Sequence, residues 1–381
     1  MIRLLHISDL HAGKKLYDRI SRNEDLNYAL EQVVRICKEE RVDLLLVAGD
    51  IFDKRNPDHG SQELIMDFLT RVNSIGLHTV LIAGNHDSYD FMRVYKHLRK
   101  LGNIHVFDRP LKNLRECIFE LGELKVACLP YPDERAITHL SEDTQRSYAH
   151  KVGNYIRALA QEVHGASYKI LMAHLMVEKA QITGSELQSS VSPFYAVKPE
   201  SIPEEFTYVA LGHVHKNQRI EGATPKVYYS GSLYQIDFSE KGMKKFVNLV
   251  ILEDGLARVE PIELSLRREL FEVHIKPEDR LEEVLPKRND VLLKIVLYMK
   301  MGDVLHHQKK EILQKELGDR LAKVEIELLE EKTLSVEERG DRPDLIDLYR
   351  DYYQKTYKTQ PSKEIEELFT TLMDRAQHEA D

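Results

Sequence analysis

Two hydrophobic patterns alternate along most of the chain. Short, continuously apolar runs are typical of strands buried on both faces, and they predict strands at 3–8, 43–48, 79–83, 125–129, 169–173 and 208–211. Apolar residues at helical spacing, such as those between Leu64 and Val72, predict helices at 25–40, 62–75, 91–101 and 144–162. This alternation predicts an α/β domain.

A different, more compact pattern begins after the stretch 262–268. Before it, strands are predicted at 226–230 and 245–252, with a hairpin turn at Glu253-Asp254-Gly255. Beyond it, strands and helices alternate in a small α/β unit at 270–275, 278–285, 291–298, 304–317 and 323–329. We therefore predict a main domain at 1–262, a second domain at 263–332, a linker at 333–342 and a helical segment at 343–381.

Two amphipathic helices are predicted in the last segment, at 343–357 and 363–377. Ser362 is a suitable N-cap for the second helix. Their apolar residues lie on one side of each helix and include Leu345, Leu348, Tyr349, Tyr352, Ile365, Leu368, Phe369 and Leu372. Two short helices cannot bury both apolar faces alone, so these faces either dock onto the same chain or bind a partner protein.

Composition places the chain among soluble globular proteins. Hydrophobic residues make up 42% of the 381 residues and charged residues 31%, and we find neither a signal peptide nor an apolar run long enough to span a membrane. The three cysteines form no CxxC pair, which favours reduced thiols in a cytoplasmic protein. The net charge of −9 does not by itself indicate a nucleic-acid-binding protein.

Five polar clusters follow the predicted strands directly. In parallel α/β sheets the carboxyl ends of the strands meet at one edge, so side chains from distant segments can converge there. Carboxylates, imidazoles and an amide suit divalent transition metals, and the seven candidates are too many for one tetrahedral site. The candidate ligands of a centre with two ions and one bridging carboxylate are Asp9, His11, Asp50, Asn85, His174, His213 and His215.

In these motifs, DxH, GD, GNHD, H and GHxH in order, the chain resembles the binuclear metallophosphoesterases. The resemblance implies a four-layer α/β sandwich in which Asp50 bridges the two ions. One ion would be bound by Asp9, His11, Asp50 and His215, and the other by Asp50, Asn85, His174 and His213. It also implies that His86 orients the phosphate or protonates the leaving oxygen, while Asp53 could orient His86 or cap the next segment.

Longer stretches resemble the SbcD-type DNA repair nuclease subunits. These stretches are LHISDLH, AGDIFD, LIAGNHD, LGHVH and YSGS, whereas the GDxVDRG and GNHE motifs of phosphoprotein phosphatases are absent. The resemblance implies a manganese-dependent exonuclease and endonuclease acting on DNA ends and hairpins, with a capping domain beside the active site. It further implies a homodimer formed by helices 62–75 and 91–101, and an SbcC-type ABC ATPase bound by the C-terminal helices.

Two alternatives to a DNA nuclease differ in their use of the site. A small-molecule phosphodiesterase or phosphomonoesterase would leave the second domain and the terminal helices without a clear role. A scaffold without catalysis would be expected to have lost ligands, and none of the seven is missing. Four basic residues that follow the first motif could contact a DNA backbone or lie on a solvated loop, namely Lys14, Lys15, Arg19 and Arg22.

Overall fold

The computed structural model describes residues 1–140, 147–186, 195–300, 306–329, 345–357, 359–363, 365–366, 368–369 and 372. The chain divides into two compact units, Met1–Leu328 and Leu329–Asp381.

The first unit contains two six-stranded sheets. The first sheet has the order β14-β13-β1-β4-β5-β6, in which β1, β4, β5 and β6 run parallel and β13 is antiparallel to both of its neighbours. Its strands are β1 (Ile2–Ile7), β4 (Leu44–Val47), β5 (His78–Ile82), β6 (Ile104–Phe107), β13 (Lys245–Glu253) and β14 (Leu256–Leu264). Asp254 and Gly255 have φ values of 50° and 77° in the turn between β13 and β14, which confirms the predicted hairpin.

The second sheet has the order β11-β12-β10-β9-β8-β7. Its central strands β8, β9, β10 and β12 run parallel, and an antiparallel strand lies at each edge. The strands are β7 (Ile118–Leu121), β8 (Leu124–Leu129), β9 (Tyr168–His174), β10 (Tyr208–Gly212), β11 (Gln218–Arg219) and β12 (Lys226–Tyr229).

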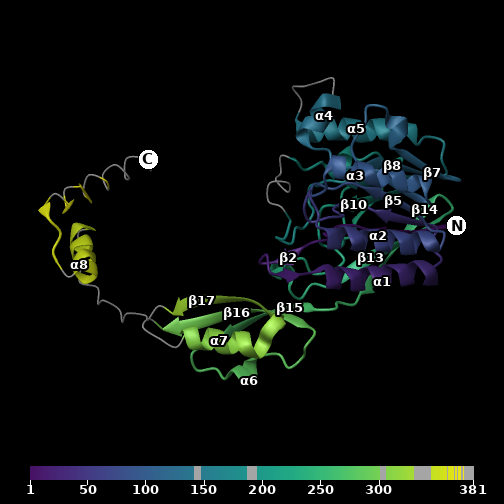
Figure 1. The fold of residues 1–381 in the computed structure, drawn as a ribbon. Helices are drawn as coiled ribbons and strands as arrows, with labels where there is room; N and C mark the ends of the chain where they lie inside the picture. Colours follow the sequence, from purple (N-terminus) through teal and green to yellow (C-terminus); the bar gives the residue numbers. More distant parts are fainter. Residues whose placement is uncertain are drawn as a thin grey trace. The chain divides into compact units, whose positions relative to one another are not determined.

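Helices cover the outer face of each sheet, which gives four layers (Figure 1). On the first sheet lie α1 (Asn23–Glu39), α2 (His59–Ser74) and α3 (Tyr89–Tyr95), and on the second lie α4 (Glu134–Leu140) and α5 (Tyr148–Glu162). A separate hydrophobic cluster fills the space between the two sheets. The predicted four-layer α/β fold is therefore confirmed.

The position of β1 explains why its sequence is continuously apolar. Leu5 and Ile7 point into the core shared with α1 and α2, whereas Leu4 points into the core between the sheets. All three side chains are fully buried. Because both faces of a central strand are covered, there is no polar alternation along it.

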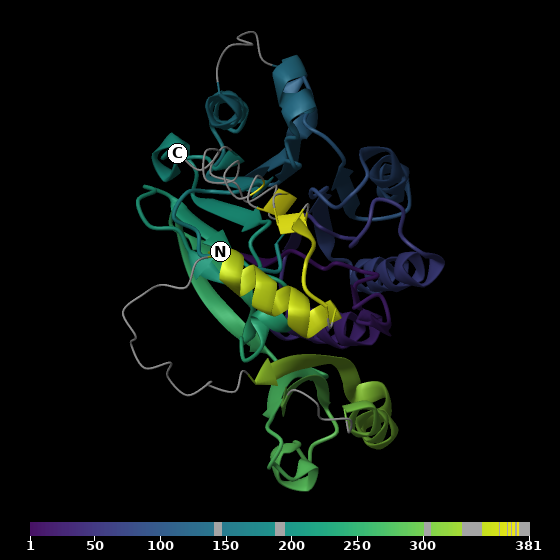
Figure 2. The same ribbon diagram turned by 90° about the vertical axis from the view of Figure 1, so that its left-hand side faces the viewer.

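A three-stranded sheet follows β14 in the chain. It has the order β15-β16-β17, and α7 packs against one of its faces through Leu313 and Leu317 (Figure 2). Its elements are β15 (Glu269–Ile275), α6 (Leu281–Val284), β16 (Val291–Lys300), α7 (His306–Leu317) and β17 (Leu321–Leu329). The helix predicted at 278–285 is thus only one turn long, between Pro277 and Pro286.

The remaining short elements connect these layers. They are the hairpin strands β2 (Lys15–Leu16) and β3 (Ile20–Ser21) and the 3₁₀ helices η1 (Lys96–Lys100), η2 (Leu114–Cys117), η4 (Pro199–Ser201), η5 (Phe238–Glu240) and η6 (Gly318–Arg320). Cys37, Cys117 and Cys128 are buried free thiols, as expected from the sequence. In the described part of the chain, no helix has both the length and the apolarity required to cross a membrane.

The second unit contains α8 (Leu345–Tyr357). Tyr349 of this helix stacks on Phe369, with ring centroids 4.0 Å apart, and Arg350 forms an ion pair with Glu366. These contacts hold α8 against the start of the second predicted helix, most of whose later part, up to 377, lies outside the described residues.

Candidate metal centre

All seven predicted ligands converge at the carboxyl ends of the central strands. In the first sheet, the loops after β1, β4 and β5 carry Asp9, His11, Asp50 and Asn85, and in the second sheet β9 and β10 supply His174, His213 and His215. Within each sheet these strands are parallel neighbours. The two sheets therefore contribute facing halves of one site.

Asp50 and Asn85 lie at the centre of the cluster. Asp50 Oδ2 is 3.4 Å from His174 Nε2 and 3.7 Å from His11 Nε2. Asn85 Oδ1 is 2.9 Å from His174 Nε2 and 2.8 Å from His213 Nδ1. Asp50 is thus within reach of residues from both halves.

Four of the seven candidates have a left-handed backbone. Asp9, His11, Asp50 and His213 have φ values of 54°, 45°, 50° and 104°. Residues other than glycine seldom adopt this conformation, which costs on the order of 1–3 kcal/mol per residue and is concentrated at functional sites. The local backbone is therefore shaped to aim these side chains.

The glycines of the motifs are required by close approach between loops. A Cβ atom on Gly84 would lie 2.1 Å from Asp50 Oδ1, and one on Gly212 would lie 1.9 Å from the carbonyl oxygen of Ala48. A Cβ atom on Gly49 would lie 2.3 Å from His174 Nδ1. Only glycine lets the three loops pack this closely.

The donor set fits divalent cations. His11 Nε2 and His215 Nε2 face each other at 3.1 Å, and three groups of histidines and carboxylates have ligand atoms within 4.8 Å of one another. His174 Nδ1 donates to the carbonyl oxygen of Ala48 at 2.8 Å, which leaves the lone pair of Nε2 directed at the cluster. Buried imidazoles and carboxylates arranged in this way are typical of sites for Mn, Fe or Zn.

The charges of the site reinforce one another. Burial alone would raise the pKa of Asp50, but His174, His86 and His11 hold it well below its usual value. Burial likewise would lower the pKa of His174, yet the neighbouring carboxylate of Asp50 raises it to about 9. The carboxylate of Asp50 and the imidazole of His174 therefore each favour the charged form of the other.

His86 lies beside the cluster and is partly exposed. Its amide donates to Asp50 Oδ1 at 2.9 Å, and its Nδ1 lies 2.9 Å from the carbonyl oxygen of Asp53. The carboxylate of Asp53 points instead toward His11 Nδ1, at 3.5 Å, and Lys14 Nζ, at 3.4 Å. Asp53 thus contacts the His86 ring through its main chain.

Asp87 connects two of the loops. Its carboxylate accepts hydrogen bonds from the amides of Gly84, Ile51 and Phe52 at 2.8 to 3.1 Å. Burial and the nearby charge of Asp50 raise the pKa of Asp87 to about 6. The fourth residue of GNHD therefore holds the GD and GNHD loops together.

One predicted DNA contact is wrong. Arg22 is completely buried, lies over the ring of Tyr234 and forms an ion pair with Asp25 at 3.2 Å, so it cannot reach a phosphate group. Arg19 is exposed but donates to the carbonyl oxygen of Leu321. Lys15 is exposed and Lys14 is half-buried, so these two remain available candidates.

The predicted partner-binding residues have different environments. Leu348, Tyr352, Leu368 and Leu372 are between 54% and 62% exposed. Tyr349 and Phe369 are stacked on each other, and Ile365 is half-buried. The side-chain environment of Leu345 lies outside what the structure describes. The exposed leucines and Tyr352 are therefore the accessible part of this set.

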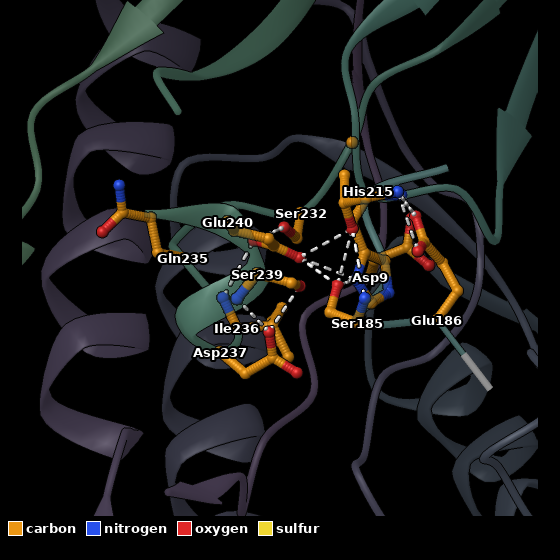
Figure 3. A network of polar contacts seen from close by, with 12 residues as sticks. Asp9, Ser185, Glu186, His215, Ser232, Gln235, Ile236, Asp237, Ser239 and Glu240 are labelled. Atoms are coloured by element: carbon orange, nitrogen blue, oxygen red, sulfur yellow. Dashed lines mark hydrogen bonds and ion pairs between the residues drawn. The ribbon is translucent and has the colours of Figure 1, made fainter. Parts of the chain in front are cut away.

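A second group of polar residues around His215 was not predicted from the sequence. Glu240, Ser185 and Glu186 all contact His215 (Figure 3). No fixed spacing links them to the GHVH motif, because Ser185 and Glu186 come from one loop and Glu240 comes from η5. The YSGS stretch indicates part of this group, because its Ser232 contacts both Glu240 and the main chain of His215.

Comparison with known proteins agrees with this geometry. Residues 2–217 match the family model of the calcineurin-like phosphoesterases. The chain is 32% identical over 263 residues to the SbcD subunit of the nuclease SbcCD of Bacillus subtilis (strain 168), with 67% of each chain covered.

Two solved structures are also similar. One is TT1561 of Thermus thermophilus, with a TM-score of 0.41 and 15% identity over 68% of this chain and 98% of that chain. The other is a dimetal phosphatase from Danio rerio, with a TM-score of 0.42 and 12% identity over 66% of this chain and 93% of that chain. The family match and the curated relative together establish that this chain belongs to the calcineurin-like phosphoesterases, a family with dinuclear metal centres, and within it to the relatives of SbcD.

Proposed function

We propose that this protein is the nuclease subunit of a DNA double-strand-break repair complex, acting as an exonuclease and endonuclease on DNA ends and hairpins. It is a phosphodiester hydrolase of the calcineurin-like family. The observation that carries the proposal is the convergence of seven residues with nitrogen or oxygen ligand atoms, Asp50 among them, with His86 beside them.

The ligand set divides between two cation sites that share Asp50. Asp9, His11, Asp50 and His215 would hold one cation, and Asp50, Asn85, His174 and His213 the other. We propose manganese for both. Cations bound there would supply an activated water nucleophile and positive charge for the phosphate oxygens.

His86 is proposed as the proton donor for the leaving oxygen. A carbonyl oxygen can only accept, so the contact with Asp53 requires that Nδ1 of His86 carries a proton. Nε2 is then the nitrogen that can deliver a proton, and the amide contact with Asp50 keeps the ring beside the reacting phosphate. Once Nε2 has given up its proton, the His86 ring is neutral and keeps the proton on Nδ1, which is hydrogen-bonded to the carbonyl oxygen of Asp53.

The rest of the chain supplies the macromolecular contacts in this proposal. Lys14 and Lys15 would meet the DNA backbone, 263–332 would act as a capping domain, and 333–342 would be a linker. Helices α2 and α3 would form a homodimer, and 343–381 would bind an SbcC-type ABC ATPase. The exposed Leu348, Tyr352, Leu368 and Leu372 support the last assignment, because an apolar face of this kind favours a protein partner.

The test of the catalytic proposal is cleavage of an end-labelled duplex and a hairpin oligonucleotide with Mn²⁺, compared with EDTA. We expect His86→Ser to abolish cleavage while calorimetry still shows two bound Mn²⁺, because a proton donor is lost but no ligand. His164→Ser, at an exposed histidine after α5, is the control. Full activity of His86→Ser would refute its role, and an inert DNA beside rapid hydrolysis of bis-p-nitrophenyl phosphate would indicate a small-molecule enzyme.

The partner assignment has a separate test. A chain ending at residue 342 should hydrolyse bis-p-nitrophenyl phosphate normally, because every site residue lies in the first unit. It should no longer copurify with the ATPase. Copurification of the truncated chain would contradict the assignment.

A further inference from the structure

The carboxylate of Glu240 lies behind His215, in η5, and is completely buried. One oxygen, Oε1, is 3.0 Å from His215 Nδ1 and accepts a hydrogen bond from the hydroxyl of Ser185 (Figure 3). The other, Oε2, accepts from the amide of Ile236 at 2.9 Å and from Lys245 Nζ at 2.5 Å. Both oxygens are thus engaged, each on a different side.

The main chain of His215 is fixed independently of its ring. Its amide donates to Glu186 Oε1 at 3.1 Å, and its carbonyl oxygen accepts from the amide of Ser232 at 3.1 Å and from Lys245 Nζ at 3.4 Å. Glu186 is in turn held by the amides of Thr183 and Gly184. These contacts place the residue, but they leave rotation of the ring and the choice of tautomer to the groups around the imidazole.

Two groups face the imidazole Nδ1 of His215. Besides Glu240, the hydroxyl of Ser185 lies 2.6 Å away, and this hydroxyl donates its own proton to Glu240. Both groups therefore present an acceptor to Nδ1, which must carry the proton. The opposite nitrogen, Nε2, then has a lone pair, and it faces the cluster, 3.1 Å from His11 Nε2.

A charged acceptor at this position differs from the one behind His174, which is the carbonyl group of Ala48. A carboxylate behind a ligating imidazole orients the ring and makes the ligand more basic. The buried ammonium group of Lys245, 2.5 Å from Oε2, compensates the charge of the buried carboxylate.

We propose that Glu240 is a positioning residue for the metal centre, which holds the ring of His215 so that Nε2 binds a cation. The inference rests on the proposed metal centre. The competing explanation is that Glu240 only neutralises the charge of Lys245. In that case, replacing both residues by uncharged side chains would leave cation binding unchanged.

The test compares variants in one background, because loss of Glu240 alone would leave Lys245 buried without a counter-ion. The full chain is prepared as K245M, E240Q/K245M and E240M/K245M, and each variant is checked by circular dichroism. Mn²⁺ affinity is measured by calorimetry, and Co²⁺ is used as a spectroscopic probe of coordination. Gln keeps an acceptor for Nδ1 without the charge, whereas Met removes both.

We expect Mn²⁺ affinity at one of the two sites to fall by about 10- to 100-fold from K245M to E240M/K245M, with an intermediate loss for E240Q/K245M. The visible spectrum of bound Co²⁺ should change in the same order. Equal affinities and spectra across the three variants would overturn the inference. If K245M does not fold, E240Q/K245M is compared directly with E240M/K245M, and equal Mn²⁺ affinities and Co²⁺ spectra in these two variants would overturn the inference.

The two proposals fail in different ways. If the natural protein does not bind two Mn²⁺, the metal centre itself is wrong. If it binds two and the double variants match K245M, only the role of Glu240 is wrong.

Discussion

Replacement of Gly84 by alanine tests how closely the loops of the site must pack. The added Cβ atom would lie 2.1 Å from Asp50 Oδ1 and 2.3 Å from the backbone nitrogen of Asp50. Gly84 does not have a positive φ, so the backbone conformation itself would accept alanine. The whole cost therefore comes from contact between the two loops.

The size of the disturbance follows from these distances. The carboxylate could rotate, but the backbone nitrogen cannot, and ordinary contacts for a Cβ atom begin at 3.4 Å. The loops after β4 and β5 must therefore separate by roughly 1 Å. Overpacking of this kind costs about 1–3 kcal/mol of stability, and a shift of about 1 Å at a reacting centre can cost on the order of 100-fold in rate.

The assay combines thermal unfolding, Mn²⁺ binding and hydrolysis of bis-p-nitrophenyl phosphate. We expect Gly84→Ala to lower all three. Gly60→Ala is the matched control, because Gly60 lies in the first turn of α2, where its Cβ atom would meet only Asp58 Oδ1 at 3.5 Å. That control should gain about 0.4–1 kcal/mol. A Gly84→Ala protein with normal stability, Mn²⁺ affinity and rate would show that the two loops can separate without cost and need not pack this closely.

Three further predictions concern stability. Arg22→Met should lower the free energy of unfolding, measured in urea, by up to about 3–5 kcal/mol, because the buried Asp25 would keep only Arg268 as an ion-pair partner. A change below about 1 kcal/mol would contradict this. Removal of metal with EDTA should lower the melting temperature, and Mn²⁺ at about 100 times its dissociation constant should restore about 2.7 kcal/mol; no shift would count against a metal-binding site. Hydrogen bonds from Lys241 and Lys294 lower the pKa of Glu272 to about 2, so its contribution is present above pH 4.5 and lost as the pH falls toward 2. The melting-temperature difference between the natural protein and Glu272→Gln should shrink over this range, and a constant difference would refute it.

The layers and the ligand cluster could be predicted because both depend on short-range patterns. Central strands such as β1 are apolar on both faces, and residues at their carboxyl ends must meet at one edge. No strand was predicted at the edge positions β6, β7, β11 and β14, although the turn before β14 was predicted. In β14 buried and exposed residues are mixed and Pro261 interrupts the run, so the pattern lacks the signal of a central strand.

The orientation of side chains could not be predicted in the same way. Arg22 belongs to a run of basic residues that suggested a DNA contact, but its burial against Tyr234 depends on a segment more than two hundred positions away. The contact of Glu240 also depends on tertiary packing, because Glu240 reaches His215 only when η5 folds against the end of β10. No spacing rule predicts such contacts, because the contact does not fix the length or the sequence of the chain between the two residues.

The contacts of η5 explain how a helix of three residues can hold a buried carboxylate in place. A single 3₁₀ turn has little stability of its own. Phe238, at its start, packs in a cluster with Leu270 and Leu292 of the three-stranded sheet, and Lys241, directly after it, forms an ion pair with Glu272 of β15 at 2.5 Å. Glu240 lies between these two anchors and points the other way, toward His215. The small sheet therefore contributes to the geometry of the site through η5, although its own residues do not belong to the ligand set.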